Sequence, residues 1–242
     1  MEQIYTIPVN ETFDVAAGDP ACGCPMCMLY RKLEENELDL ILGASMMEPD
    51  VRIKTNKLGF CRTHYDMMFV RKNRLGMALT LESHLAELKN DLKAGFLDTL
   101  LGKPAARPQK RIAALEGSCY VCERVAFHFM HMAETVALLY DTDPDFAAKL
   151  QKQPYFCLPH YRLLLSVGSE QLDRKKAAAF ADILGRVVGA YLDTLSEDVS
   201  WFCKKFDYRY EDEPWKNAKD SVERAIRFLR SDLHAAPGKD KK

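Results

Sequence analysis

The sequence predicts a mostly α-helical protein with a duplicated helical repeat, in which each copy carries a CxxC…CxxH metal-binding motif, and a C-terminal helical extension. Three observations predict this class. Apolar residues recur at helical spacing, the alternation typical of strands is scarce, and one set of cysteine and histidine motifs occurs twice. The chain of 242 residues, 48% of them hydrophobic, suffices for one large domain or two small ones.

Three pairs of segments at nearly the same offset indicate the duplication. Residues 24–27 (CPMC) recur at 119–122 (CYVC), 60–65 (FCRTHY) at 156–161 (FCLPHY), and 96–100 (FLDTL) at 191–195 (YLDTL). The short linker favours one continuous body. The predicted organisation is an extended N-terminal arm (1–19), a first repeat (20–100), a linker (101–114), a second repeat (115–195), an aromatic-rich segment with a C-terminal helix (196–234) and a disordered tail (235–242).

Apolar periodicity places the individual helices. It predicts helices over 27–43 and 76–93, a helix that ends near Tyr140, a long helix through 180–195, and a last helix over 222–233 capped by Asp220 or Ser221. The run Asp141–Asp145 predicts a helix end followed by a new N-cap. Residues 4–9 and 51–55 are expected to form short extended pieces, and the acidic run 34–37 is interpreted as a solvated helix face.

Cysteine and histidine form the strongest functional pattern. Each repeat holds CxxC, a long insert and CxxH, and three thiolates with one imidazole form the closed tetrahedral shell that structural Zn²⁺ prefers. Each pair is expected at the start of a helix, where the helix dipole favours thiolates. We therefore predict two zinc ions per chain and no catalytic residue. The predicted ligands are Cys24, Cys27, Cys61 and His64 for site 1, and Cys119, Cys122, Cys157 and His160 for site 2.

Other interpretations of these cysteines remain open at this point. They can be buried core residues or a redox dithiol, although neither explains the duplicated histidine. An iron–sulfur cluster is the main alternative cofactor, since Cys22 adds a thiol beside Cys24. Cys22 is also a candidate extra redox thiol.

The C-terminal extension holds a candidate partner-binding segment, in which aromatic side chains alternate with basic ones. The candidates are Trp201, Phe202, Lys204, Lys205, Phe206, Tyr208, Arg209 and Trp215. The alternative is that these aromatics pack across the two repeats. The formal net charge of −1 favours a protein or peptide partner and makes a nucleic acid an unexpected one.

Several segments resemble a family of bacterial proteins defined as a domain of unknown function. They are Met47–Arg52 (MEPDVR), Asn56–Cys61 (NKLGFC) with His64, Asn73–Gly76 (NRLG) and Trp201–Arg209 (WFCKKFDYR). The resemblance covers nearly the whole chain and includes the repeated CxxC and FCxxH elements. It implies a soluble bacterial protein and carries over no activity. In this chain the second CxxC lacks the proline of the first.

Two functional hypotheses follow. The first is a non-enzymatic binding or regulatory scaffold braced by two structural Cys₃His sites, and the second is a redox-responsive or iron–sulfur protein that uses the same cysteines. A transcriptional regulator is a weaker third. The N-terminus lacks the pattern of a secretory signal, and no stretch approaches the roughly 18 apolar residues of a membrane span, so we expect a cytoplasmic location.

Overall fold

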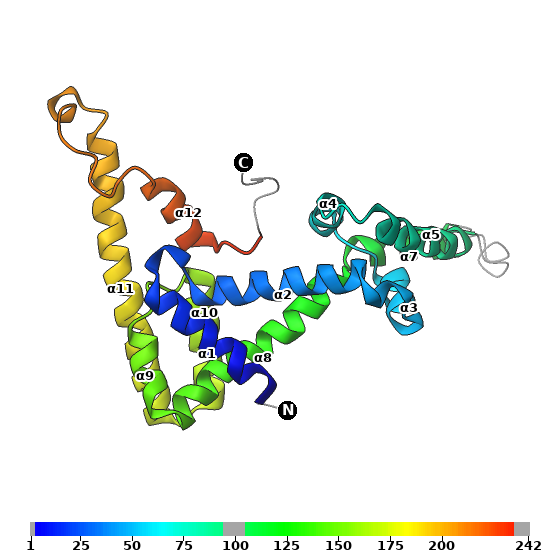
Figure 1. Ribbon diagram of the computed structural model, residues 1–242, viewed down its shortest axis with the longest axis horizontal. Coiled ribbons are helices and arrows are strands. Elements are labelled where there is room, and N and C mark those ends of the chain that lie inside the picture. The colour runs from blue at the N-terminus through cyan, green and yellow to red at the C-terminus, as the bar shows by residue number, and fades with distance from the viewer. Residues whose placement is uncertain (1–2, 94–104, 235–242) are drawn as a thin grey trace. The chain divides into compact units, whose positions relative to one another are not determined.

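The computed structural model describes residues 3–93 and 105–234, and these residues are mostly helical (Figure 1). No strand occurs within these two ranges, so the predicted mostly α class is confirmed. The repeated segment 96–100 and the predicted tail 235–242 lie outside the described residues.

The chain divides into two compact units that do not coincide with the predicted repeats. The first unit contains the described residues up to Arg31 and from Phe129 onwards, and the second contains Lys32–His128. Each unit therefore combines residues from both repeats. Helices α2 (Pro25–Leu42) and α8 (Tyr120–Thr142) each begin in one unit and end in the other.

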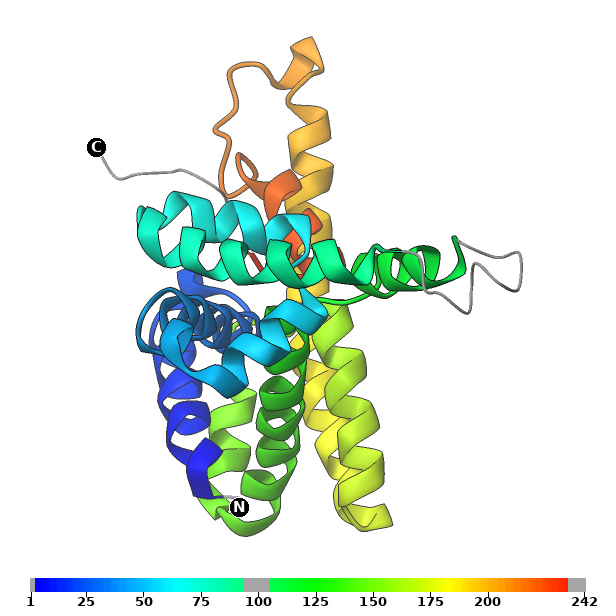
Figure 2. The ribbon, with the colours of Figure 1, turned by 90° about the vertical axis from the view of Figure 1, so that its right-hand side faces the viewer.

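The first unit is organised along the long helix α11 (Arg174–Lys204). This helix packs against α9 (Pro144–Gln151), α10 (Leu158–Gln171) and α12 (Ser221–Arg230), and Figure 2 shows α10 and α11 running side by side. Phe13, Phe146, Phe156, Phe180 and Phe228 are fully buried in its core. Its further elements are α1 (Gln3–Gly18), η1 (Pro20–Cys22), α9 (Pro144–Gln151), α10 (Leu158–Gln171), α11 (Arg174–Lys204), η3 (Tyr208–Tyr210) and α12 (Ser221–Arg230).

The N-terminus is helical, so the predictions of an extended arm at 1–19 and an extended piece at 4–9 are wrong. Helix α1 includes Pro8, and its first half is rich in the β-branched residues that favour strands. Its buried side chains are nevertheless Val9, Thr12, Phe13 and Ala16, which share one helical face. Tertiary packing of that face outweighs the local preference.

In the second unit α3 (Pro49–Leu58) packs against α5 (Arg74–Asp91) and α7 (Ala106–Glu116). The predicted extended piece 51–55 is wrong, because it lies inside α3, whose first residue is Pro49, a position that suits proline. Part of the predicted linker 101–114 is also helical, since α7 begins at Ala106. The elements are η2 (Ala44–Met47), α3 (Pro49–Leu58), α4 (Arg62–Val70), α5 (Arg74–Asp91) and α7 (Ala106–Glu116).

Each CxxC motif is followed by four α-helices, although only the first series also contains a short 3-10 helix, η2. Helices α2, α3, α4 and α5 follow the first motif, and α8, α9, α10 and α11 follow the second. In both series a long helix comes first and a short one second. The predicted cap between α8 and α9 is confirmed, because the Asp143 side chain accepts a hydrogen bond from the Asp145 amide.

Candidate metal centres

The eight predicted ligands form two clusters, but the halves of the two predicted sites are exchanged. The outer cluster, made by the first and last pairs in the chain, consists of Cys24, Cys27, Cys157 and His160. The inner cluster, made by the two middle pairs, consists of Cys61, His64, Cys119 and Cys122. The predicted division into site 1 and site 2 is therefore wrong, since each cluster joins the CxxC of one repeat to the CxxH of the other.

Helix length explains the exchange. Helix α2 has 18 residues and carries the chain about 27 Å away from Cys24, whereas the 10 residues of α3 return at most about 15 Å before Cys61. In the second series α8, with 23 residues, is about 34 Å long, and α9, with 8 residues, is about 12 Å long. In each series the second helix is thus too short to bring the CxxH motif back to the CxxC motif that precedes it.

All four pairs lie at helix starts, as predicted. In each pair one ligand immediately precedes the helix and the other is its third residue, so both face the same end of the helix. Cys24 and Cys27 begin α2, Cys61 and His64 begin α4, Cys119 and Cys122 begin α8, and Cys157 and His160 begin α10. Two helix N-termini therefore meet at each cluster, and their dipoles stabilise negative charge on the sulfurs.

The spacing of the donor atoms fits one tetrahedral ion. Zinc–sulfur bonds of about 2.3 Å and zinc–nitrogen bonds of about 2.0–2.1 Å require S···S edges of about 3.8 Å and S···N edges of about 3.6 Å. The Sγ atoms of Cys27 and Cys157 lie 3.7 Å apart, and those of Cys61 and Cys122 lie 3.9 Å apart. These separations are far longer than a disulfide bond, and all eight cysteines of the chain are free thiols.

The outer cluster is completely buried. His160 presents Nδ1 to its three sulfurs, at 3.1 Å from Cys157, 3.4 Å from Cys27 and 3.6 Å from Cys24. Its ring packs against Phe129 with the centroids 5.2 Å apart. The four side chains of this cluster are therefore shielded from solvent.

Residues that follow α12 contact the outer cluster from far along the chain. The backbone amide of Asp232 donates a hydrogen bond to Cys27 Sγ at 3.4 Å, and Ser231 Oγ lies 3.2 Å from Cys157 Sγ. The Asp232 carboxylate pairs with Arg31 at 2.9 Å. These contacts were not predicted from the sequence, since nothing in residues 231–232 resembles a metal-site motif.

The inner cluster has a different surrounding. His64 again presents Nδ1 to the sulfurs, at 3.2 Å from Cys61 and Cys119 and 3.4 Å from Cys122. Its Nε2 lies 3.0 Å from Glu34 Oε1, and both side chains are buried. This arrangement matches the carboxylate–histidine–metal triad, in which the carboxylate orients the ring. Cys61 and Cys122 are only partly buried.

The acidic run 34–37 is therefore not the solvated face that we expected. Glu34 and Glu37 are buried, and Glu37 pairs with Arg124 at 3.1 Å. The sequence did hold a signal, because Glu34 and Glu37 are spaced three apart and so share one side of α2. Their role depends on partners in α4 and α8 that the spacing does not reveal.

Interactions among neighbouring sulfurs separate their pKa values. Hydrogen bonding to Cys157 raises the pKa of Cys27 to about 12, whereas hydrogen bonds from Cys24 and Cys27 lower the pKa of Cys157. Burial raises the pKa of Cys119, but the hydrogen bond to His64 outweighs it and brings the pKa to about 6. A divalent cation stabilises all the thiolates of a cluster together, so both donor sets suit a metal ion.

A backbone contact joins the two halves of the inner cluster. The carbonyl of Gly59 accepts a hydrogen bond from the Tyr120 amide at 2.9 Å, and the Ser118 hydroxyl donates to the Leu58 carbonyl at 2.7 Å. Gly59 has a φ of 60°, which only glycine adopts readily, and a Cβ there would lie 3.2 Å from Leu115. The left-handed glycine thus brings Cys61 beside Cys119.

Cys22 belongs to neither cluster. Its thiol donates a weak hydrogen bond to Asp19 Oδ2 at 3.5 Å. Burial and the neighbouring Asp19 carboxylate raise the pKa of the Cys22 thiol. A raised pKa reduces the fraction of thiolate, which is the reactive form, and the role of Cys22 as an extra redox thiol stays a prediction.

The aromatic-rich segment folds on itself beyond the end of α11. Lys205 Nζ donates to the carbonyls of Tyr210, Glu211 and Glu213 at 2.6–2.7 Å, and Trp201 Nε1 donates to the Pro214 carbonyl at 3.0 Å. Lys205 therefore closes the loop and is not displayed to a partner.

The other predicted partner-binding residues differ in exposure. Phe206 is 75% exposed and Tyr208 is 85% exposed, so these two aromatics do not pack across the repeats. Lys204 and Arg209 are exposed as well, whereas Trp201, Phe202 and Trp215 are half-buried. Phe202 contacts both Phe206 and Trp215.

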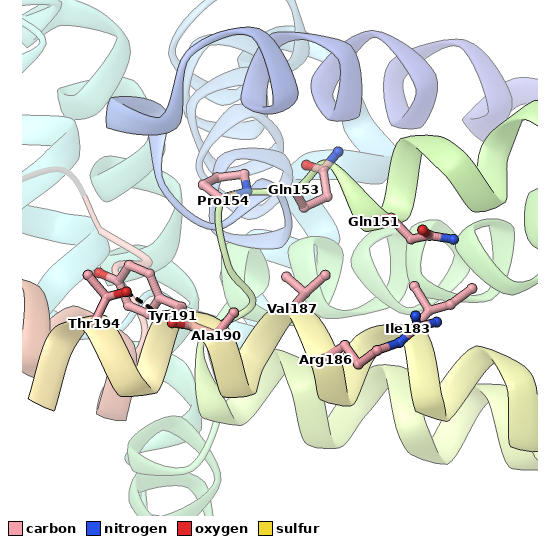
Figure 3. Close-up of a pocket in the computed structure, with 9 residues that line it drawn as sticks. All are labelled: Gln151, Gln153, Pro154, Ile183, Arg186, Val187, Ala190, Tyr191 and Thr194. Carbon is pink, nitrogen blue, oxygen red and sulfur yellow. Dashed lines mark hydrogen bonds between the residues drawn. The ribbon is translucent and has the colours of Figure 1, made fainter.

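A shallow pocket lies in the first unit, between α11 and the segment after α9 (Figure 3). Arg186 is the one charged residue among the nine that line it, and none of the eight cluster residues takes part. The lining residues are Gln151, Gln153, Pro154, Ile183, Arg186, Val187, Ala190, Tyr191 and Thr194.

Comparison with known proteins agrees with the resemblance seen in the sequence. Residues 1–236 match the model of a family described as a family of unknown function (DUF6062). The chain belongs to this family. No curated protein matches the chain, and no solved structure matches it. Within the described residues, no helix is both long and apolar enough to span a membrane.

Proposed function

We propose that this protein is a zinc-binding helical scaffold whose two Cys₃His centres are structural. The supporting observation is that four protein ligands converge on one point in each cluster, within 4.8 Å of one another. Four ligands complete the tetrahedral shell of zinc, whereas a catalytic zinc keeps a position open for water or substrate. We therefore assign the centres to folding and not to chemistry.

The compactness of the clusters favours a single ion over an iron–sulfur cluster. In a multi-iron cluster the thiolates bind different irons and stand apart, whereas here the measured S···S separations match the edge length of a single tetrahedron. A mononuclear iron centre fits the same shell. Zinc is preferred because an imidazole and thiolates together are usual zinc ligands.

Elemental analysis of protein purified without a metal-affinity tag tests this proposal. We expect about two zinc ions per chain and no visible absorption band. Iron with charge-transfer bands would favour the redox alternative, and a chain without metal would refute the proposal.

We further propose that the scaffold acts in the cytoplasm and binds a protein or peptide through the loop beyond α11. The exposed side chains of Phe206 and Tyr208 support this assignment, because exposed aromatics are frequent anchors of interfaces. The double variant Phe206→Ser, Tyr208→Ser should lose a partner recovered with the parent protein while keeping both metal ions. If this variant retains the partner, the loop is excluded as the binding site.

A redox-responsive role is a second candidate, and the exposure of the inner cluster favours it. Cys61 and Cys122 are the partly exposed ligands, and their sulfurs lie 3.9 Å apart. Hydrogen peroxide would take two electrons from these thiolates and two protons from solvent, giving two water molecules and a Cys61–Cys122 disulfide, and the loss of two ligands would release the ion. Retention of both metal ions in excess peroxide would exclude this role.

A further inference from the structure

The four residues that follow α12, 231–234, contact the outer cluster and the helix that begins there. Ser231 Oγ lies 3.2 Å from Cys157 Sγ, and the amide of Asp232 donates to Cys27 Sγ at 3.4 Å. Two of the three outer sulfurs therefore have a hydrogen-bond partner in one short segment. We call residues 231–234 the strap.

The backbone of the strap has an unusual conformation at the point of contact. Ser231 has a φ of 72°, which lies in the left-handed region that residues with a Cβ seldom adopt. This turn ends α12 and directs the next amide, that of Asp232, toward Cys27. The contact with the sulfurs is thus maintained against a local conformational preference.

The strap is also attached to α2, just after the ligand Cys27. The carboxylate of Asp232 pairs with Arg31 at 2.9 Å, and Arg227 of α12 lies 3.9 Å from the same carboxylate. The ring of His234 contacts that of Tyr30 edge-to-face, with centroids 6.1 Å apart. Side-chain contacts therefore hold the strap on the same turns of α2 that carry the cluster.

We propose that the strap is a positioning element of the outer centre, so that metal binding there and docking of the strap are coupled. This inference depends on the proposed zinc function. Three thiolates and one imidazole around Zn²⁺ carry a formal charge of −1, and hydrogen bonds donated to the sulfurs stabilise that charge. When the ion leaves, the thiolates take up protons from water and become neutral thiols, which accept hydrogen bonds more weakly, so the strap loosens. Coupling is reciprocal, and a loosened strap in turn weakens retention of the ion.

The coupling predicts a change at one centre only. Ser231→Ala removes the hydroxyl, and Asp232→Asn removes the ion pair with Arg31 while keeping the amide. Each variant should release one of its two zinc ions to a chelator roughly 10-fold faster, a loss typical of a missing outer partner of a metal ligand. Arg62→Gln is the matched control, because it removes an ion pair with Asp66 of the same length, 2.9 Å, beside the inner ligand Cys61. It should leave the release of the outer ion unchanged.

Hydrogen exchange provides a second measurement on the full-length protein. Amides of the strap should exchange slowly in the zinc-loaded protein and at least 10-fold faster after the ion of the outer centre is removed. Ser231→Gly distinguishes loss of the hydrogen bond to Cys157 from a general loss of folding stability, because glycine suits the backbone at this position but lacks the hydroxyl. We expect this variant to keep its thermal stability and still release zinc faster.

The outcomes distinguish the strap from the zinc proposal. A parent protein that binds no zinc would refute both. If the parent protein binds two zinc ions and neither Ser231→Ala nor Asp232→Asn changes their release rates, the proposed coupling of the strap is wrong but the zinc proposal stands. Strap amides that exchange at the same rate with and without zinc would also overturn it.

Discussion

The outer and inner clusters use the same four donors in different surroundings. The outer one is buried throughout, packs its histidine against Phe129 and accepts hydrogen bonds from the strap. The inner one exposes part of Cys61 and Cys122 and supports its histidine with the buried carboxylate of Glu34. Identical ligand sets therefore need not be equally stable or equally reactive, because the neighbours of the ligands set access and charge.

The largest effect should come from removing a ligand. Cys157→Ser in the outer cluster is expected to abolish one metal site and to lower the free energy of unfolding by about 4 kcal/mol or more, because a buried structural ion contributes directly to folding. Cys61→Ser should abolish the other site with a smaller loss, since its sulfur is partly exposed. Metal content and thermal melting of both variants measure the difference. Equal losses would refute the asymmetry.

The pH dependence of metal binding should be steep at both centres. Burial lowers the pKa of His64, but its hydrogen bonds to Cys119 and Glu34 outweigh this and raise the pKa to about 10. At neutral pH, binding of the ion must therefore displace a proton from His64 as well as from thiols with raised pKa values, such as Cys122. Because binding releases protons, affinity should strengthen as pH rises and weaken as it falls. Competition with a chelator at about pH 6 to 8 measures how steeply the metal affinity changes with pH. A flat profile would contradict the proton release.

Glu34→Gln should weaken the inner centre selectively. The amide keeps the shape of the side chain but removes the charge that supports His64, so affinity at this centre should fall roughly 10-fold while the outer centre is unaffected. Glu37→Gln is a suitable control, because Glu37 is buried on the same helix but pairs with Arg124. Stepwise zinc titration distinguishes the two sites. A similar loss in both variants would indicate a general effect on α2.

Glycine substitutions should leave both metal sites in place and lower only the stability of the chain where it approaches each cluster. Gly59→Ala beside the inner cluster and Gly23→Ala beside the outer one place a Cβ at φ values of 60° and 82°. Each should lower the free energy of unfolding by about 1–2 kcal/mol. Their Cβ atoms would lie 3.2 Å from Leu115 and 3.1 Å from Tyr155 Oη. Urea denaturation of the zinc-loaded variants measures the losses, and an unchanged midpoint would show that the neighbours adjust freely.

The sequence was sufficient for the ligand types and for their places at helix starts. Short motifs such as CxxC and CxxH are local, and so is the apolar spacing that follows each one. Which motifs share an ion depends on where the helices end in space, and the repeat favoured the wrong pairing. Helix α1 was not predicted, because its β-branched residues and Pro8 locally favour an extended segment. The helix depends on tertiary packing of the face that contains Phe13, which the local pattern does not reveal.

The neighbours of the ligands could not be predicted in the same way. Glu34 is one of several acids in a run, and its burial depends on His64, which lies 30 residues later. Asp232 contacts Cys27 across 205 positions. No local pattern encodes such distant contacts, whereas the ligands themselves stand in pairs that spacing reveals.

The order of the motifs along the chain has a consequence for synthesis and folding. The ligand pairs are nested, so the loop closed by the inner cluster lies wholly within the loop closed by the outer one. As the chain leaves the ribosome, the inner set is complete once Cys122 has emerged, and the outer set waits for His160. Closing the inner loop first also shortens the effective loop that the outer cluster must close, which reduces its entropic cost. Nesting therefore favours assembly from the middle of the chain outward, in which the contact between the strap and Cys27 forms after both ligand sets are complete.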